Sequence, residues 1–281
     1  MRTTLSRKKN LALNITSVLL LIVLLLPLYW MIATSLKYEK EVFASPPTLF
    51  PSQINTETYT AQLQTGDFNM FQAFGNSTII ALCSMLIALV LAVPASYGLA
   101  RFRFKAKKLF VLFFLVTQML PVSVLLTPLF ILFKNLSLSS SSVLSTILAD
   151  ATIGIPFSVL ILRAYFGSIP KEIEDAALID GCNRFTSFLR IFIPIAKPGV
   201  AVCGVFSFLY AWGDLAFGLT FIRDQSLRPI TAGIFNFFGQ YGTTWSYLCA
   251  FGVVTIIPVV LIFIFMQKYI ISGLTAGAVK G

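Results

Sequence analysis

Six separate apolar runs, each long enough to cross a lipid bilayer as a helix, dominate the sequence. A hydrocarbon core of about 30 Å needs roughly 20 apolar residues in helical conformation. Only 11% of the 281 residues are charged, whereas soluble domains carry roughly 25%. Too few polar residues remain to cover a soluble surface, so the runs predict an all-α integral membrane protein with six transmembrane helices. The predicted spans cover residues 13–36, 76–100, 109–133, 142–166, 198–222 and 247–271.

The basic segment 1–12 precedes the first run, as it would in a secretory signal peptide. The apolar stretch is too long for a signal peptide, and no clear small-x-small cleavage site follows it. We therefore interpret the first run as an uncleaved anchor.

The distribution of basic residues predicts the orientation of the spans. Sixteen of the 21 Lys and Arg lie on one side, in or next to residues 1–12, 101–108, 167–197 and 272–281. The other five lie in or next to residues 37–75, 134–141 and 223–246. Cytoplasmic segments are enriched in Lys and Arg, so both termini are predicted to be cytoplasmic. A net charge of +10 can also indicate nucleic-acid binding, but basic residues placed between apolar runs are typical of topology signals, and no nucleic-acid partner is expected.

One predicted cytoplasmic segment carries the most informative pattern. Ser168 is a possible helix cap, Pro170 falls in the first turn, and acidic residues follow near the positive end of the helix dipole. Gly181 is well placed to end this helix. Three- and four-residue spacing predicts that one face holds Ile173, Ala176, Ala177 and Asp180. Small side chains on a short helix suit docking into another protein, although an ordinary connecting helix would show the same pattern.

This segment resembles the "EAA" signature of permeases from type I ABC importers. The run Glu174-Asp-Ala-Ala-Leu-Ile-Asp-Gly181 carries the resemblance, with Pro194 downstream. The family usually has Glu at the position of Asp175. The resemblance implies a coupling helix that inserts into a separate ATPase, with its coupling residues at Glu174, Asp175, Ala176, Ala177, Asp180, Gly181 and Pro194.

Three further segments resemble the MalG-type sugar branch of the same family. They are Ala95-Ser-Tyr-Gly-Leu-Ala-Arg101, Gly239-Gln-Tyr-Gly242 with Trp245, and the terminus Gly273-Leu-Thr-Ala-Gly-Ala-Val-Lys-Gly281. The resemblance implies the MetI-like fold over about residues 72–271. It also implies a tail that reaches toward the ATPase dimer, through Thr275, Gly277 and Lys280.

Two carboxylates fall at membrane depth, Asp150 in the fourth span and Asp214 in the fifth. A charge at the bilayer centre costs roughly 2.5–3.5 kcal/mol, so such groups usually face a cavity or a partner. Both residues, together with Trp212, are candidates for the translocation path, and each carboxylate could instead cap or join helices of the bundle. Relatives often have Trp-Asn-Glu where this chain has Trp212-Gly213-Asp214.

The sequence contains no phosphate loop, because Gly-Lys does not occur in it. It also contains no His, and its four Cys show no metal-ligand spacing. The resemblance therefore implies a permease that is not an enzyme and holds no cofactor, with ATP and magnesium bound by a partner ATPase dimer. The other implied partners are a second, related permease, an extracellular solute-binding protein or lipoprotein, the lipid of a bacterial-type cell membrane, and a di- or oligosaccharide substrate.

Three other functions fit parts of the pattern. An ABC permease could carry another polar solute, such as glycerol phosphodiesters. An ion-driven secondary carrier usually shows inverted repeats and midplane clusters of ionisable residues, which this sequence lacks. A non-transporting membrane scaffold would not need a coupling-type segment.

Overall fold

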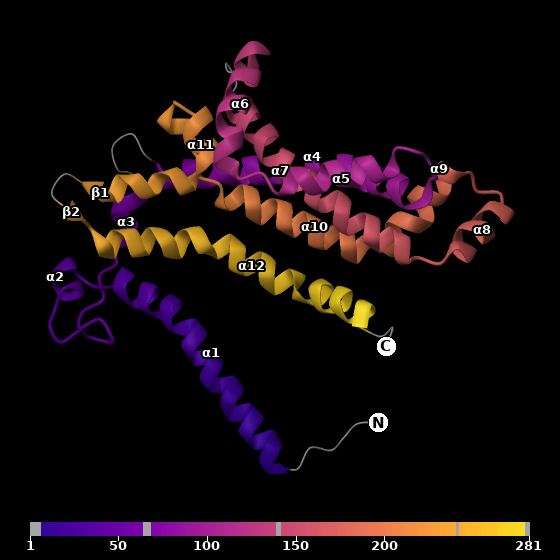
Figure 1. Ribbon diagram of the computed structural model, residues 1–281. Coiled ribbons are helices and arrows are strands. Elements are labelled where there is room, and N and C mark those ends of the chain that lie inside the picture. Colours follow the sequence, from indigo (N-terminus) through magenta and orange to yellow (C-terminus); the bar gives the residue numbers. More distant parts are fainter. Residues whose placement is uncertain (1–6, 64–68, 139–141, 240–241, 279–281) are drawn as a thin grey trace. The chain divides into compact units, whose positions relative to one another are not determined.

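The computed structural model describes residues 7–63, 69–138, 142–239 and 242–278, and these are mostly helical (Figure 1). The contacts divide the chain into two compact units. One comprises Met1–Thr65 with Ile234–Ile256, and the other comprises Gly66–Gly233 with Ile257–Gly281. Helix α12, Trp245–Ala278, contributes to both.

Three long helices, α4, α7 and α10, form the core of the second unit and lie side by side (Figure 1). They cover Met70–Arg101, Ser142–Ser168 and Ile193–Gly213. Asn69 caps α4, because its side-chain oxygen accepts a hydrogen bond from the Gln72 amide at 3.1 Å. Ala88, Ser158 and Ser207 are buried in this core. Small residues allow membrane helices to approach closely, which is how these three backbones pack together.

The third apolar run does not form one straight helix. It divides into α5, Lys107–Gln118, and α6, Val122–Asn135, which are bent by 105° with respect to each other. Pro121 at the break has extended backbone (ψ 143°) and lacks an amide hydrogen, so it cannot continue the helical hydrogen bonds of α5. Five helices of the described chain are long and apolar enough to cross a membrane, and six if the bent pair counts as one span.

The fifth run also differs from a single helix over residues 198–222. The helical segment begins earlier, with α9, Arg184–Ser187, and a π-helical turn η3, Phe188–Phe192, which leads into α10. Helix α10 ends at Gly213, and a short helix α11, Ala216–Phe221, follows. Two 3₁₀ segments come next, η4, Gln225–Leu227, and η5, Ile230–Phe237.

The first unit combines α1, Arg7–Ser35, with short elements joined by polar contacts. These elements are α2, Glu39–Val42, α3, Glu57–Thr60, η1, Ala61–Leu63, and the antiparallel pair β1, Phe238–Gly239, and β2, Gly242–Thr243. The Glu39 carboxylate accepts hydrogen bonds from the amides of Trp245 and Ser246 at 2.9 and 3.0 Å. These amides open α12, so Glu39 satisfies donors that have no partner within the helix.

A second carboxylate, Glu41, orders the loop that follows α2. It accepts hydrogen bonds from the Ser52 amide and hydroxyl, each at 2.9 Å, and from the Thr48 hydroxyl at 2.8 Å. These hydrogen bonds lower the pKa of Glu41 below its ordinary value, and the bond from the Ser52 amide has the largest effect, with that from the Thr48 hydroxyl second.

Other helix ends also differ from the predicted spans, most clearly at α4 and α12. Helix α4 begins at Met70, within the predicted loop 37–75. Helix α12 continues to Ala278, so most of the predicted tail 272–281 is helical.

Candidate coupling site and membrane-depth carboxylates

The predicted coupling helix is present as α8, Lys171–Ile179. The prediction that Ser168 caps this helix is wrong. Ser168 is instead the last residue of α7, and its hydroxyl donates to the Tyr165 carbonyl at 2.8 Å. Pro170 occupies the N-cap position rather than the first turn and has no side-chain hydrogen bond. A proline disfavours helical backbone in the residue before it, which explains why α7 ends ahead of Pro170 and a new helix starts after it.

Gly181 ends α8, as the sequence predicts. It has a φ of 82°, in the left-handed region that glycine adopts without strain. Its amide donates to the Leu178 carbonyl at 3.2 Å, and the Cys182 amide donates to the Ala177 carbonyl at 2.9 Å. This pair of bonds is a Schellman motif, which satisfies two carbonyls at the helix end.

The predicted face of α8 divides into two environments. Ala177 is buried and Ile173 is half-buried against the bundle, whereas Ala176 and Asp180 are exposed. The four positions still lie on one side of the helix, as their spacing predicts, and the boundary between the buried and the exposed surface of α8 runs through them. Asp175 is also exposed, and Pro194 is exposed in the first turn of α10.

The sequence pattern missed the apolar residues that α8 and α9 expose. Ile179 is 85% exposed and Phe185 is 69% exposed, and Leu178 is also exposed. Asn183 fixes the start of α9, since its side-chain oxygen accepts a hydrogen bond from the Thr186 amide at 2.8 Å. The residue types of Leu178, Ile179 and Phe185 alone could not reveal their exposure, because apolar side chains are normally assigned to a core.

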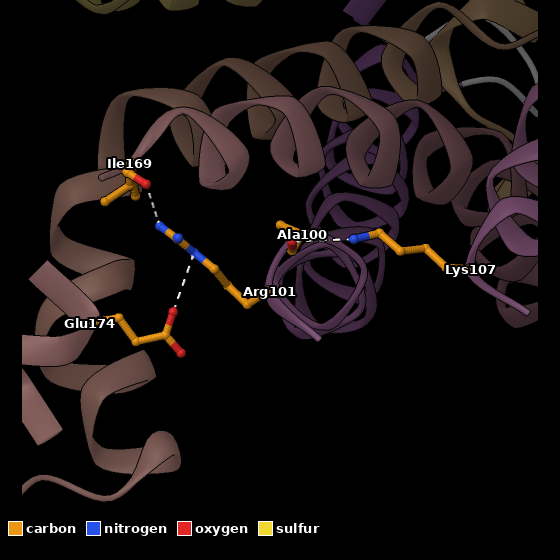
Figure 2. A network of polar contacts seen from close by, with 5 residues as sticks. All are labelled: Ala100, Arg101, Lys107, Ile169 and Glu174. Carbon is orange, nitrogen blue, oxygen red and sulfur yellow. Dashed lines mark hydrogen bonds and ion pairs between the residues drawn. The ribbon is translucent and has the colours of Figure 1, made fainter. Parts of the chain in front are cut away.

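Glu174 faces the bundle, unlike its neighbour Asp175. Figure 2 shows its carboxylate directed at Arg101, the last residue of α4, with 3.8 Å between Nε and Oε2. Arg101 Nη2 also donates to the Ile169 carbonyl at 2.7 Å, in the linker between α7 and α8. Close by, Lys107 Nζ donates to the Ala100 carbonyl at 3.3 Å (Figure 2). Sequence reasoning treated Arg101 only as part of a motif and a topology signal.

Asp214 caps a helix. Its Oδ1 accepts a hydrogen bond from the Phe217 amide at 3.3 Å, and its Oδ2 accepts one from the Gly218 amide at 3.0 Å. These amides open α11, so the carboxylate stabilises the turn that follows α10. The Thr231 hydroxyl donates to the Asp214 carbonyl at 2.6 Å. This geometry matches the structural alternative that the sequence left open for Asp214.

The other two membrane-depth candidates are both buried. Trp212 stacks on Phe208 with 5.8 Å between ring centroids and meets the Phe74 ring edge-on at 5.2 Å. Asp150 is 2% exposed, and neither carboxylate oxygen has a hydrogen-bond partner within the described part of the chain. A buried carboxylate without a partner is costly, so Asp150 remains a candidate for a role in transport.

The predicted ATPase-contacting tail is only partly described. Thr275 and Gly277 lie in the last turns of α12, whereas Lys280 lies outside the described residues.

Sequence comparison places these features in a known family. The profile of the family described as "Binding-protein-dependent transport system inner membrane component" matches residues 85–275, more than half of the chain. The chain belongs to this family. The matched region contains α8, the Schellman motif, Asp150 and Asp214. The chain is accordingly a multi-pass membrane component of a transport system that depends on a binding protein, and it is not an enzyme.

Individual relatives resemble this inner membrane component over nearly its full length. The diacetylchitobiose uptake system permease protein DasC of Streptomyces coelicolor is 32% identical, over 95% of this chain and 96% of that protein. The trehalose/maltose transport system permease protein MalG of Thermococcus litoralis is also 32% identical, over 97% of this chain and 98% of that protein.

A solved structure shares the fold of this inner membrane component. A chain of a bacterial ABC transporter involved in the import of the acidic polysaccharide alginate superimposes with a TM-score of 0.77, at 21% identity, over 94% of this chain and 98% of that chain.

Proposed function

We propose that this chain is one of two permease subunits of an ATP-driven sugar importer, and that α8 and α9 dock on a separate ATPase. Membership of the family supports a binding-protein-dependent transporter. The diacetylchitobiose uptake system of DasC and the trehalose/maltose system of MalG support a sugar substrate of the di- or oligosaccharide class.

The exposed apolar surface of α8 and α9 carries this proposal. Leu178 and Ile179 are exposed on α8, which lies outside the long apolar helices, and Phe185 is exposed on α9, at the start of the long helical segment that continues into α10. Contiguous exposed apolar side chains mark interaction sites. Exposed Ala176 and Gly181 add little bulk beside them, so a partner can approach the backbone closely. The excess of Lys and Arg at this end supports its location in the cytoplasm, where ATP is available.

The mechanism that follows is alternating access driven from this surface. ATP and magnesium bind in the ATPase dimer, whose closure displaces α8. The displacement rocks this chain against a second, related permease between inward-open and outward-open states. An extracellular solute-binding protein delivers the sugar at the opposite end.

Crosslinking to the partner ATPase tests this function. A photo-crosslinking amino acid replaces Ile179 in one variant and Phe50, an exposed residue of the predicted outer loop, in the control. We expect the ATPase to be captured from position 179 and not from position 50. Absence of the crosslink in an assembled, transporting complex would contradict the docking assignment.

Transport measurements test the energy source and the substrate. Reconstituted with its partners, the chain should take up a di- or oligosaccharide only with ATP, and Ile179→Asp should abolish uptake because it places a charge in the apolar contact. Uptake that continues without ATP and stops when the membrane potential collapses would indicate an ion-driven carrier instead. ATP-dependent uptake of a solute other than a sugar would retain the ABC mechanism and overturn the substrate class.

A further inference from the structure

We propose that Arg101 is the positioning residue that links the coupling helix to α4, so that a displacement of α8 moves the helix bundle. This inference rests on the proposed function and adds to it the route by which α8 acts.

The position of Arg101 is the first argument. It is the last residue of α4, and only 5% of its side chain is exposed. Its guanidinium contacts the Ile169 carbonyl in the α7–α8 linker and the Glu174 carboxylate on α8 (Figure 2). It also lies over the face of the Phe192 ring in η3, 4.7 Å from the ring centroid. One side chain therefore joins four elements at the end of the bundle that carries α8.

The chemistry of the guanidinium is the second argument. Its planar group can donate in several directions while its face lies over an aromatic ring, which a lysine ammonium cannot reproduce. Removing a charged group from such a site leaves its buried partners without compensation. Glu174 is only 16% exposed, and its Oε2 lies 3.8 Å from Arg101 Nε, so Arg101→Ala would remove the cation that faces this carboxylate.

The packing beyond Arg101 is the third argument. Tyr97, one turn earlier on α4, is buried among Phe166 of α7 and Phe188 and Phe192 of η3, with ring centroids 4.7–5.8 Å apart. Close-packed aromatic rings transmit displacement because they leave no void to absorb it. Helix α4 then packs along both α7 and α10. A movement of α8 that reaches Arg101 is thus passed to all three core helices.

The linkage is tested by the ratio of sugar molecules transported to ATP molecules hydrolysed, measured in the reconstituted complex. For Arg101→Ala we expect ATP hydrolysis to continue while the ratio falls about tenfold, the factor that corresponds to about 1.4 kcal/mol. Arg101→Lys should restore only part of the ratio, because lysine keeps the charge and loses the simultaneous contacts. Glu174→Gln should lower the ratio in the same direction.

Two matched variants control for charge alone. Arg103→Ala removes an exposed arginine from the same basic turn, and Glu172→Gln neutralises an exposed glutamate on the same helix. Both should keep the wild-type ratio.

Three outcomes would overturn the linkage. The first is an unchanged ratio in Arg101→Ala. The second, if that variant fails to assemble, is a wild-type ratio in Arg101→Lys. The third is an equal loss in Arg103→Ala.

The crosslink from position 179 separates this proposal from the proposed function. If the crosslink persists in the Arg101 variants and the ratio does not change, the linkage is wrong and the docking assignment stands. If the wild-type protein shows no crosslink, the docking assignment itself fails.

Discussion

Gly181 shows how a single residue can set the end of the coupling helix. A Cβ built at this position would meet no atom of this chain within 4 Å, so within the chain only its positive φ opposes substitution. We expect Gly181→Val to cost about 1–2 kcal/mol, the penalty for left-handed backbone, and to uncouple transport from ATP hydrolysis while the protein stays inserted. Gly181→Asn should retain most of the coupling, because Asn tolerates this region. Sugar uptake per ATP compares the variants, and equal losses for Val and Asn would contradict a backbone cause.

Glu41 predicts a pH dependence at the loop after α2. Its folded pKa is lowered below the ordinary 4.5 by hydrogen bonds from Ser52 and Thr48. The ionised Glu41 carboxylate therefore stabilises the folded loop fully above pH 4.5, and this stabilisation is lost as the pH falls through the lowered folded pKa. Hydrogen exchange at the Ser52 amide, corrected for its intrinsic rate, should show constant protection from pH 7 to 5 and a loss only below 4.5. In Glu41→Gln the protection should be weaker and should not titrate, and an unchanged profile in that variant would exclude Glu41 as the cause.

The sequence predicts residues whose role is local, and it misses those whose role depends on distant contacts. Gly181 could be recognised as a stop because the freedom of glycine is a property of its own backbone. The pairing of Arg101 with Glu174 joins positions 73 residues apart in the sequence, so no local pattern contains it. The same holds for Asp214. Its carboxylate accepts hydrogen bonds from the first amides of α11, and the sequence did not predict that a helix starts there.

At the scale of elements, close packing between α4, α7 and α10 depends on Gly154. A Cβ at this position would lie 2.8 Å from Ser207 Oγ and 3.2 Å from the Ala88 Cβ. We expect Gly154→Ala to destabilise the bundle by about 1–3 kcal/mol through overpacking, which thermal unfolding in detergent would measure.

Gly167 on the same helix provides the control, because a Cβ there meets no atom within 4 Å. Gly167→Ala should be neutral or stabilising by up to about 1 kcal/mol, since alanine favours helix. Adding Ser207→Gly to Gly154→Ala should recover part of the loss. Equal destabilisation by the two alanine substitutions would show that the contact with Ser207 is not responsible.

The apolar runs predict where helices occur and do not predict where they bend. Prolines lie inside α1, α4, α6, α7, α10 and α12 without ending them. Pro121 alone coincides with the 105° break between α5 and α6. A helix continues through a proline where neighbouring groups supply hydrogen bonds to the freed backbone groups, and it breaks where they do not. Those neighbours are known only from the tertiary structure.

At the scale of the whole molecule, the orientation of the chain links the residues to the energy source. The coupling surface can meet a nucleotide-binding partner only if α8 lies in the cytoplasm. The count of Lys and Arg favours a cytoplasmic α8, because sixteen of them lie on the α8 side and five on the other.

A variant that keeps only Cys182 of the four cysteines measures this orientation directly. Cys182 follows Gly181 and is partly exposed. In intact cells we expect a membrane-impermeant maleimide to leave Cys182 unlabelled until the membrane is permeabilised. A second variant, with Ser52→Cys as its only cysteine, should be labelled without permeabilisation because Ser52 is exposed in the predicted outer loop. Labelling of Cys182 in intact cells, with Ser52→Cys protected, would invert the topology. It would remove α8 from any contact with an ATPase, because the hydrolysis of ATP and the helix it is proposed to move would then lie on opposite sides of the membrane.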